Sequence, residues 1–449
     1  DRAPLVSPAA PDETWDSCPK TRVFQRQPEF SLAVCGTCIL IEFRLIGGNE
    51  GDADWREQCN SQCKACEPGP ELAKDLRPPG ATAGFSLVRE RCCSPFLPSL
   101  GHSSPAHSKG SKPFMFDAPV ALLDGLKASG IKIVSFANNH VMDQGWPGFA
   151  ETREHLRDEG LLFAGSGDTA QQQWQPVITE ANGIKVGWLG MTRWLNGNRN
   201  PDKDDQPHVN FFPYPGESGG APGMDEAGVL DAIGKARAQC DFLVVSIHWG
   251  TEYAPAPRPE DVDTAHKMLE AGASVIVGHH PHVLQPVETY RTADGRDTVI
   301  FYSLGNFLSN QSRNYVDGLM PDKDGDPRDE MIGLFSAVRK DYGPAGVRVE
   351  LGHVGVLPAW SENNRNEIAA GRAKTAMIRP ILMDREIPRL QAKLDELSKL
   401  NTAATPLTAA QKKEFIELTN QLKLLDDRRK LLVARVGDEY IMEAPESKP

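Results

Sequence analysis

The sequence has few basic residues for its length, and it contains no long hydrophobic segment. Of its 449 residues, 49 are Lys or Arg and 61 are Asp or Glu, which gives a formal net charge of −12. A protein that binds nucleic acid needs basic surface to neutralise phosphates, so nucleic acid is not an expected partner. No apolar run reaches the roughly 18 residues of a membrane-spanning helix. The sequence therefore predicts no transmembrane segment.

Cysteine is scarce outside one part of the chain. Eight of the nine cysteines precede residue 94, and only Cys240 follows it. The spacing of Cys59, Cys63 and Cys66 is compatible with a zinc or iron–sulfur site, which the Cys-x2-Cys pair at 35–38 would complete. Disulfides in an exported chain are an alternative, and the absence of any defined role is another.

Residues 1–112 show little regular patterning. Residues 1–29 are expected to form an N-terminal linker, whose first dozen residues are rich in Pro, Ala and Asp. Linkers of this kind follow export signals, so we expect an exported, periplasmic or cell-surface protein. Residues 30–112 form an atypical Cys-rich segment. Its apolar stretch at 30–41 predicts one strand, after which Pro, Gly, Ser and Cys dominate. The rest of this segment is expected to be irregular or disordered.

Residues 113–385 alternate between helical and strand patterns. Helical spacing over 119–129 precedes a β-branched apolar run at 131–136, and the same alternation recurs. Further helices are predicted at 147–159, 226–238 and 260–271, and further strands at 161–163, 184–189, 241–247, 274–277 and 298–303. Short apolar strands separated by amphipathic helices predict an α/β fold with a helix-covered sheet.

Residues 386–449 predict a C-terminal helical extension. Leucines between Leu390 and Leu397 form one stripe, and Thr408 with Gln411 forms a capping box ahead of a second stripe. We expect a helical hairpin that packs against the preceding domain or against a second copy of the chain.

Polar side chains follow four of the predicted strands. The four stretches are ANNHVMD at 137–143, HWGTEY at 248–253, GHHPH at 278–282 and LGNF at 304–307. The carboxyl ends of strands in a helix-covered sheet share one edge, where ligand sites form. Five of the eleven histidines are therefore expected on one rim. The other six, which we interpret as incidental, are His102, His107, His155, His208, His266 and His353.

Imidazole, amide and carboxylate groups at this rim suit a divalent metal ion such as Mn, Zn or Fe. A pair of such ions can stabilise the attacking and leaving oxygens of a phosphoryl transfer. His280 and His282 are two residues apart in what we expect to be an extended segment, so their rings should face the same side. We expect both to bind metal together with His248 and Asn139. His140 directly follows Asn139 and should point elsewhere, which suits a general acid facing the leaving group.

Other polar residues of the rim have less specific roles. Glu252, His279 and Asn306 are candidates for substrate binding. Asp143 and Glu252 are each equally compatible with orienting a histidine and with contacting the substrate. Asn306 follows a glycine and is equally compatible with a turn residue in the left-handed conformation.

The stretches around these residues resemble the CapA family, the capsule and poly-γ-glutamate biosynthesis proteins with a calcineurin-like metallophosphatase fold. The matching segments are SFANNHVMDQG (135–145), FAGSGD (163–168), SIHWGTEYAPAP (246–257), AGASVIVGHHPHVLQPVE (271–288) and FYSLGNFL (301–308). The resemblance implies a four-layer α/β/β/α metallophosphatase-like sandwich, with its metal site at strand ends.

The resemblance also implies individual roles. Asn139 and His140 match the Asn-His motif of the family, and His248 matches the histidine of its third motif. His280 and His282 match the closing pair, in which His279 is an alternative to His280.

The N-terminal part departs from the family pattern. Family members open with strands that end in Gly-Asp and in Gly-Asn-Leu-Glu. Here the first strand reads LAVCGTCIL, with Thr37 where Asp is expected, and Gly-Asn-Leu-Glu is absent. Residues 35–112 are therefore either an out-of-frame translation or a divergent insertion, and Asp52 and Asp54 follow no motif order. Without a bridging carboxylate we expect a single, more weakly held ion.

Two functions remain as hypotheses. One is a CapA-type protein with a metal-dependent phosphoesterase-like hydrolase site that acts on a cell-envelope substrate. The other is a non-catalytic accessory of polyglutamate or capsule synthesis and export that binds polymer carboxylates on the same rim. In both, the expected partner is an anionic cell-envelope polymer such as poly-γ-glutamate, and other capsule-synthesis components are further candidates.

Overall fold

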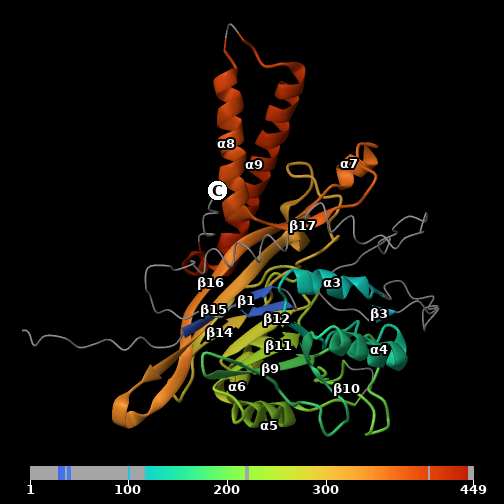
Figure 1. The fold of residues 1–449 in the computed structure, drawn as a ribbon, viewed down its shortest axis with the longest axis vertical. Helices are drawn as coiled ribbons and strands as arrows, with labels where there is room; N and C mark the ends of the chain where they lie inside the picture. Colours follow the sequence, from blue (N-terminus) through green and yellow to red (C-terminus); the bar gives the residue numbers. More distant parts are fainter. Residues whose placement is uncertain are drawn as a thin grey trace, which may run out of the picture.

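The computed structural model describes residues 29–35, 38–41, 100–101, 116, 118–217, 222–402 and 405–442. Over these residues the chain has an α/β fold built on two large sheets, with helices on their outer faces (Figure 1). The cysteine cluster at 59–66, His102, His107 and most of the atypical segment lie outside the described residues.

One sheet has seven strands and is mostly antiparallel. Its spatial order is β17 (Ile378–Leu382), β16 (Val347–Asn363), β15 (Asp329–Asp341), β1 (Glu29–Cys35), β2 (Cys38–Ile41), β5 (Ile133–Ser135) and β6 (Leu162–Ala164). The prediction of one strand over 30–41 is wrong, because β1 and β2 pair antiparallel with Cys35 opposite Cys38. A continuous apolar run does not mark the point at which a chain reverses.

The second sheet has six strands. Its spatial order is β13 (Val287–Arg291), β14 (Asp297–Phe301), β12 (Val275–His279), β11 (Phe242–His248), β9 (Ile184–Thr192) and β8 (Val177–Ala181). The four central strands are parallel and the two edge strands are antiparallel. The carboxyl ends of β9, β11 and β12 therefore meet at one edge, and β11 and β12 are buried throughout, as is typical of parallel strands.

Helices cover the outer faces of both sheets. Helices α3 (Ala121–Ala128) and α4 (Gly145–Asp158) pack on the seven-stranded sheet, and α5 (Glu226–Arg237) and α6 (Pro259–Glu270) pack on the six-stranded sheet. Between the sheets lies a third apolar core, where the rings of Phe242 and Phe335 stack at 6.2 Å. This is the four-layer α/β/β/α arrangement that the sequence resemblance implied.

A long antiparallel ribbon, β15 with β16, was not anticipated from the sequence. It runs through the seven-stranded sheet and extends beyond it (Figure 1). The first nine residues of β15 are all buried, so the strand shows no alternation of apolar and polar residues there.

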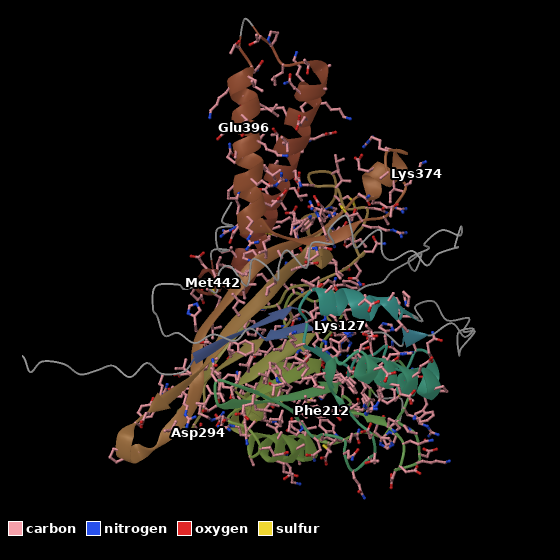
Figure 2. All side chains as sticks on the ribbon, in the orientation of Figure 1. Lys127, Phe212, Asp294, Lys374, Glu396 and Met442 are labelled. Atoms are coloured by element: carbon pink, nitrogen blue, oxygen red, sulfur yellow. The ribbon has the colours of Figure 1, made fainter. Side chains whose placement is uncertain are left out.

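Two long helices follow the ribbon, α8 (Met383–Leu400) and α9 (Ala409–Val436). Near the sheets they join the inter-sheet core through Leu390, Leu425 and Leu432, while their outer part, where Glu396 lies, extends away from the sheets (Figure 2). The predicted capping box is confirmed: the Thr408 side chain accepts from the Gln411 backbone, and the Gln411 side chain accepts from the Thr408 backbone.

The remaining elements are short. They are β3 (Leu100–Gly101), β4 (Ala118–Pro119), β7 (Ser166–Gly167), β10 (His208–Val209), α7 (Arg365–Ala369) and the 3-10 turns η1 (Asp322–Asp324), η2 (Asp326–Arg328), η3 (Gly343–Ala345) and η4 (Asp438–Tyr440). Among the helices of the described residues, none combines the length and the apolar character needed to cross a membrane.

Candidate metal centre

The predicted site residues come from strand ends of both sheets. His248 is the last residue of β11, and His279 is the last residue of the neighbouring strand β12. His280 and His282 lie in the loop that follows β12, and Asn139 lies in the turn that follows β5. The two sheets thus contribute to one site, whereas the sequence led us to expect the rim of a single sheet.

The four predicted metal ligands lie together and are buried. The Oδ1 atom of Asn139 is 3.0 Å from Nε2 of His248. The ring centroids of His248 and His280 are 4.5 Å apart, and those of His280 and His282 are 5.8 Å apart. One amide oxygen and three imidazoles therefore lie side by side in one buried cluster.

A carboxylate completes this group. One ligand atom each from Glu252, His280 and His282 lies within 4.8 Å of the others. Glu252 Oε1 is 3.9 Å from Nε2 of His282, and the Glu252 side chain is 49% exposed. Glu252, expected from the sequence as a substrate contact or an orienting residue, thus lies where it could serve as a ligand on the open side of the site.

The loop that carries the two histidines is not extended. The φ angle is 106° at His280 and 62° at His282, in the left-handed region that non-glycine residues rarely adopt. The expectation of an extended segment is therefore wrong, and the two ring centroids lie 5.8 Å apart. Such conformations cost about 1–3 kcal/mol each and cluster at functional sites, where the surrounding structure holds them.

His279 contacts the ring of His248 and is not placed to contact a substrate. Its Nδ1 atom is 2.8 Å from Nδ1 of His248, and its Nε2 atom is 3.0 Å from the Ser246 hydroxyl. His279 is only 1% exposed. This chain of contacts orients the His248 ring so that Nε2, not Nδ1, faces Asn139.

Asn306 supports His282 in a similar way. Its amide nitrogen donates to the backbone oxygens of His282 and Pro327, which fixes the orientation of the amide. Its Oδ1 atom therefore accepts a hydrogen bond from Nδ1 of His282 at 3.1 Å. The neutral imidazole of His282 then has its lone pair on Nε2, the atom that faces Glu252.

His140 forms a buried pair with Asp143. Nδ1 of His140 is 2.8 Å from Asp143 Oδ2, and that oxygen also accepts a hydrogen bond from the backbone of Phe116. Asn196, which the sequence analysis did not single out, accepts a hydrogen bond from the amide of Asn139, and its own amide nitrogen lies 3.4 Å from Nδ1 of His140. The only sequence signal for Asn196 is its position before a glycine, where it adopts a positive φ of 50°.

Burial keeps the imidazoles of the site neutral. Loss of water lowers the pKa of His279 to about 3 and that of His282 to about 4, and it moves the pKa of His248 and of His280 well below the ordinary value. Neighbouring imidazoles lower these values further, because two cations so close together would repel each other. Neutral imidazole is the form that binds metal.

The comparisons with known proteins concern the same part of the chain. Residues 99–311 match the family model described as "Bacterial capsule synthesis protein PGA_cap". "Capsule biosynthesis protein CapA" of Bacillus anthracis is 32% identical over 218 residues, which are 48% of this chain and 49% of that protein. "PGA biosynthesis protein CapA" of Bacillus subtilis (strain 168) is 34% identical over 187 residues, which are 41% and 44% of the two chains.

A more distant relative is a "Probable polyglutamine synthesis accessory protein" of Mycobacterium tuberculosis. It is 25% identical over 174 residues, which are 35% of this chain and 41% of that protein. The chain thus spans about half, or less, of the length of these curated relatives. A solved structure of a hypothetical protein from Thermus thermophilus covers 52% of this chain and 79% of its own, at 15% identity and a TM-score of 0.27. Residues 99–311, which contain Asn139, Glu252 and the five histidines of the site, are therefore similar to the bacterial capsule synthesis proteins of the CapA family.

Proposed function

We propose that this site holds one divalent metal ion and hydrolyses a phosphoester in the cell envelope, as part of capsule or polyglutamate biosynthesis. The observation that carries the proposal is the group of Glu252, His280 and His282, whose ligand atoms lie within 4.8 Å of one another beside the ring of His248. The names of the CapA relatives support the biosynthetic setting. The exported location remains a prediction from the sequence.

The residues present fit a metal ion by the chemistry of their donor atoms. Nδ1 of His280 is buried and has no hydrogen-bond partner among the described residues, although an unpaired buried nitrogen is unfavourable. Nε2 of His282 carries a lone pair because Nδ1 donates to Asn306. Nitrogen and oxygen donors of this kind suit Mn, Zn or Fe.

Each residue has a distinct part in the proposed reaction. A bound ion would polarise a phosphoryl oxygen of the substrate. Asn139, His248, Glu252, His280 and His282 would hold that ion. His140 would protonate the leaving oxygen, and because Asp143 engages Nδ1, the transferred proton is the one on Nε2.

The charge of the site limits it to one ion. Glu252 is the only carboxylate in the ligand group that the described residues form, whereas two divalent ions need more negative charge nearby. This shortage also favours a second candidate function, in which the same site binds polymer carboxylates through a bound cation, without hydrolysis. The accessory role in the name of the Mycobacterium tuberculosis relative is compatible with that alternative.

Hydrolysis of bis(p-nitrophenyl) phosphate by the full chain distinguishes the two. We expect turnover that EDTA abolishes and that Mn²⁺ or Zn²⁺ restores. His140→Ala should lower kcat by about 10²- to 10⁴-fold without loss of metal, because a general acid contributes roughly that much. His353→Ala, at an exposed residue of the ribbon, is the matched control and should leave kcat unchanged.

The alternative, a non-catalytic accessory, predicts polymer binding without hydrolysis. Binding of poly-γ-glutamate that weakens with salt, together with no chelator-sensitive turnover, would reject the hydrolase and favour the accessory role.

A further inference from the structure

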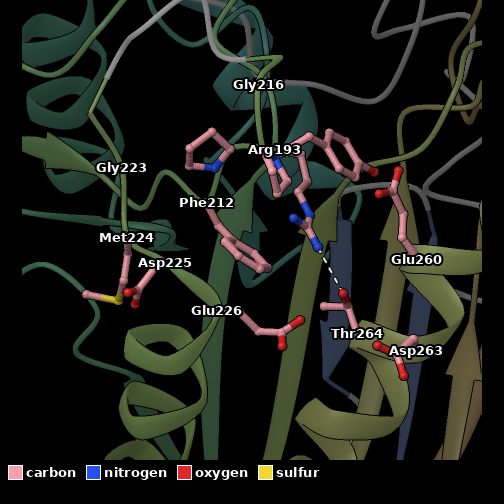
Figure 3. A pocket seen from close by; sticks show the side chains of 13 residues that line it. Arg193, Phe212, Gly216, Gly223, Met224, Asp225, Glu226, Glu260, Asp263 and Thr264 are labelled. Atoms are coloured by element: carbon pink, nitrogen blue, oxygen red, sulfur yellow. Dashed lines mark hydrogen bonds between the residues drawn. The ribbon is translucent and has the colours of Figure 1, made fainter.

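A cavity of about 440 Å³ lies between the loop after β10 and the N-terminal ends of α5 and α6 (Figure 3). It contains none of the proposed metal ligands. Its lining includes one arginine, Arg193, together with the aromatic side chains of Phe212 and Tyr214 and several carboxylates. Its volume lies in the range of small-molecule sites.

Arg193 is a buried cation that forms no ion pair within 4 Å among the described residues, although the charges of Asp261, Glu260 and Glu226 are near enough to favour its protonated form. It follows the last residue of β9 and is only 4% exposed. The centre of its guanidinium group lies 3.7 Å from the ring centroid of Phe212 and 4.4 Å from that of Tyr214. Nη2 donates to Thr264 at 3.1 Å, and Nε has no hydrogen-bond partner in the described part of the chain.

Such an arrangement is unfavourable in the protein alone. Burial of a charge costs free energy that a paired anion normally offsets, and buried arginines are almost always paired. The planar guanidinium presents several N–H groups in one plane, a geometry that matches a carboxylate or a phosphate. Arg193 therefore indicates a ligand with an anionic group.

The carboxylates around the cavity restrict the ligand further. Glu226 and Asp263 share Lys267 as an ion-pair partner, and Glu260 pairs with Arg258. These three carboxylates are exposed or half-exposed, and Figure 3 shows Arg193 directed toward the space between Glu226, Glu260 and Thr264. A phosphate dianion would be repelled by this acidic rim, whereas a ligand that carries an ammonium group beside its carboxylate would be attracted.

We propose that this cavity binds the zwitterionic α-amino acid group of a ligand. The α-carboxylate pairs with Arg193, and the α-ammonium lies against the rim formed by Glu226, Glu260 and Asp263. The cavity also adjoins the metal centre: the Tyr214 hydroxyl accepts from the backbone of Gly250, and Trp194, the residue after Arg193, lies 6.3 Å from the ring of His280.

Isothermal titration calorimetry with three small ligands tests the proposal. L-Glutamate carries both groups, N-acetyl-L-glutamate lacks the ammonium, and L-glutamic acid α-amide lacks the α-carboxylate. We expect one L-glutamate per chain and dissociation constants for the other two that are about tenfold higher or more. The titrations contain EDTA, so failure of the metal-centre proposal does not affect the result.

Two variants locate the binding. Arg193→Met should weaken L-glutamate binding by about tenfold or more, because it removes the only cation that lines the described cavity. Arg291→Met removes an exposed arginine of β13 and is the matched control, which should bind as the wild type does. Glu226→Gln changes a half-exposed side chain and should fold normally. It should weaken binding of L-glutamate several-fold but leave binding of N-acetyl-L-glutamate unchanged.

Several results would overturn the proposal. These are no binding of L-glutamate, equal binding of N-acetyl-L-glutamate, inorganic phosphate that binds more tightly than L-glutamate, and an Arg193→Met variant that binds as the wild type does. If Arg193→Met does not fold, as judged by circular dichroism, the Glu226→Gln variant tests the proposal instead. Unchanged binding of L-glutamate by that variant would overturn it.

Discussion

Two buried polar clusters in this protein differ in whether their charges are paired. At the base of the helical hairpin, Arg428 is 1% exposed and donates to Asp329, to Asp326 and to the backbone of Asp322. Arg435 binds the other oxygen of Asp326. In the histidine site, by contrast, the imidazoles are neutral and the one carboxylate of the ligand group is half-exposed.

The comparison separates groups that hold the fold from groups that remain available to a ligand. Every nitrogen of the Arg428 guanidinium has a partner within the chain, so the cluster joins α9 to β15 and needs nothing else. Nδ1 of His280 has no such partner among the described residues, and its backbone adopts an unfavourable conformation. Arg193 resembles the histidine site, since it too is buried, forms no ion pair within 4 Å among the described residues and leaves Nε without a hydrogen-bond partner there.

The largest expected effect is on stability, at the paired cluster. Arg428→Met leaves Asp329 buried without its cation, and we expect the free energy of unfolding to fall by about 3–5 kcal/mol. Lys423→Met, which removes ion pairs of an exposed lysine on the same helix, should cost much less, because exposed ion pairs contribute little to stability. Urea unfolding of both variants measures the difference. If both variants lost the same free energy of unfolding, the buried Arg428 cluster would not hold the fold in the way proposed.

The second effect is on metal binding. His280→Ala removes a proposed ligand that has no hydrogen-bond partner at Nδ1 in the described structure, so the metal-free protein should lose little stability. We expect metal affinity to fall by about 100-fold or more. Loss of a residue that only orients a ligand lowers metal affinity by about 10- to 100-fold, so the larger effect identifies a ligand. Competition with a metal indicator measures the affinity, and His353→Ala serves as the control. Unchanged affinity would exclude His280 as a ligand.

The positions of these residues could largely be predicted from the sequence, because the proposed ligands lie at or soon after the ends of apolar strands. The ends of β11 and β12 place His248 and His279 at one edge, and parallel pairing makes that edge shared. The roles of His279 and Asn306 could not be predicted, since they depend on which way each side chain turns in three dimensions. The same holds for Arg193, which adjoins α5 and α6 only after the chain folds.

The fold was predictable to a similar extent. The boundaries of α5 and β11 agree with the sequence pattern to within one residue. The β15–β16 ribbon escaped prediction because burial on both faces removes the alternation that identifies a strand.

A third effect depends on pH and concerns Asp261, a buried carboxyl beside Tyr214. Burial raises the pKa of Asp261 from 3.8 to about 6. The folded protein therefore binds this proton more tightly than the unfolded chain does, so the stabilising contribution is full below pH 3.8 and is lost as the pH rises through 6. Asp261→Asn stays neutral, and Oδ1 can still accept from the Tyr214 hydroxyl.

We therefore expect Asp261→Asn to gain about 2–3 kcal/mol relative to the wild type as the pH rises from about 4 to about 7. Urea unfolding of both proteins across this range gives the difference, in which the titration of all other groups cancels. A difference that does not change with pH would show that the Asp261 pKa is not raised.

The smallest effect distinguishes a supporting residue from a ligand. Asn306→Ala removes the acceptor that orients the His282 ring, and we expect metal affinity to fall by about tenfold, less than for His280→Ala. The same competition assay measures it. A loss as large as that of His280→Ala would mean that Asn306 acts on the metal directly.

The most direct test of the account is the metal content of the protein. Metal-free protein is dialysed against Mn²⁺ or Zn²⁺, and the bound metal is measured by mass spectrometry for the wild type and for a variant with both His280→Ala and His282→Ala. We expect one ion per chain in the wild type and none in the variant, with the circular dichroism spectrum unchanged. A wild type without a stoichiometric ion, or a variant that takes up as much metal, would contradict the proposed metal centre.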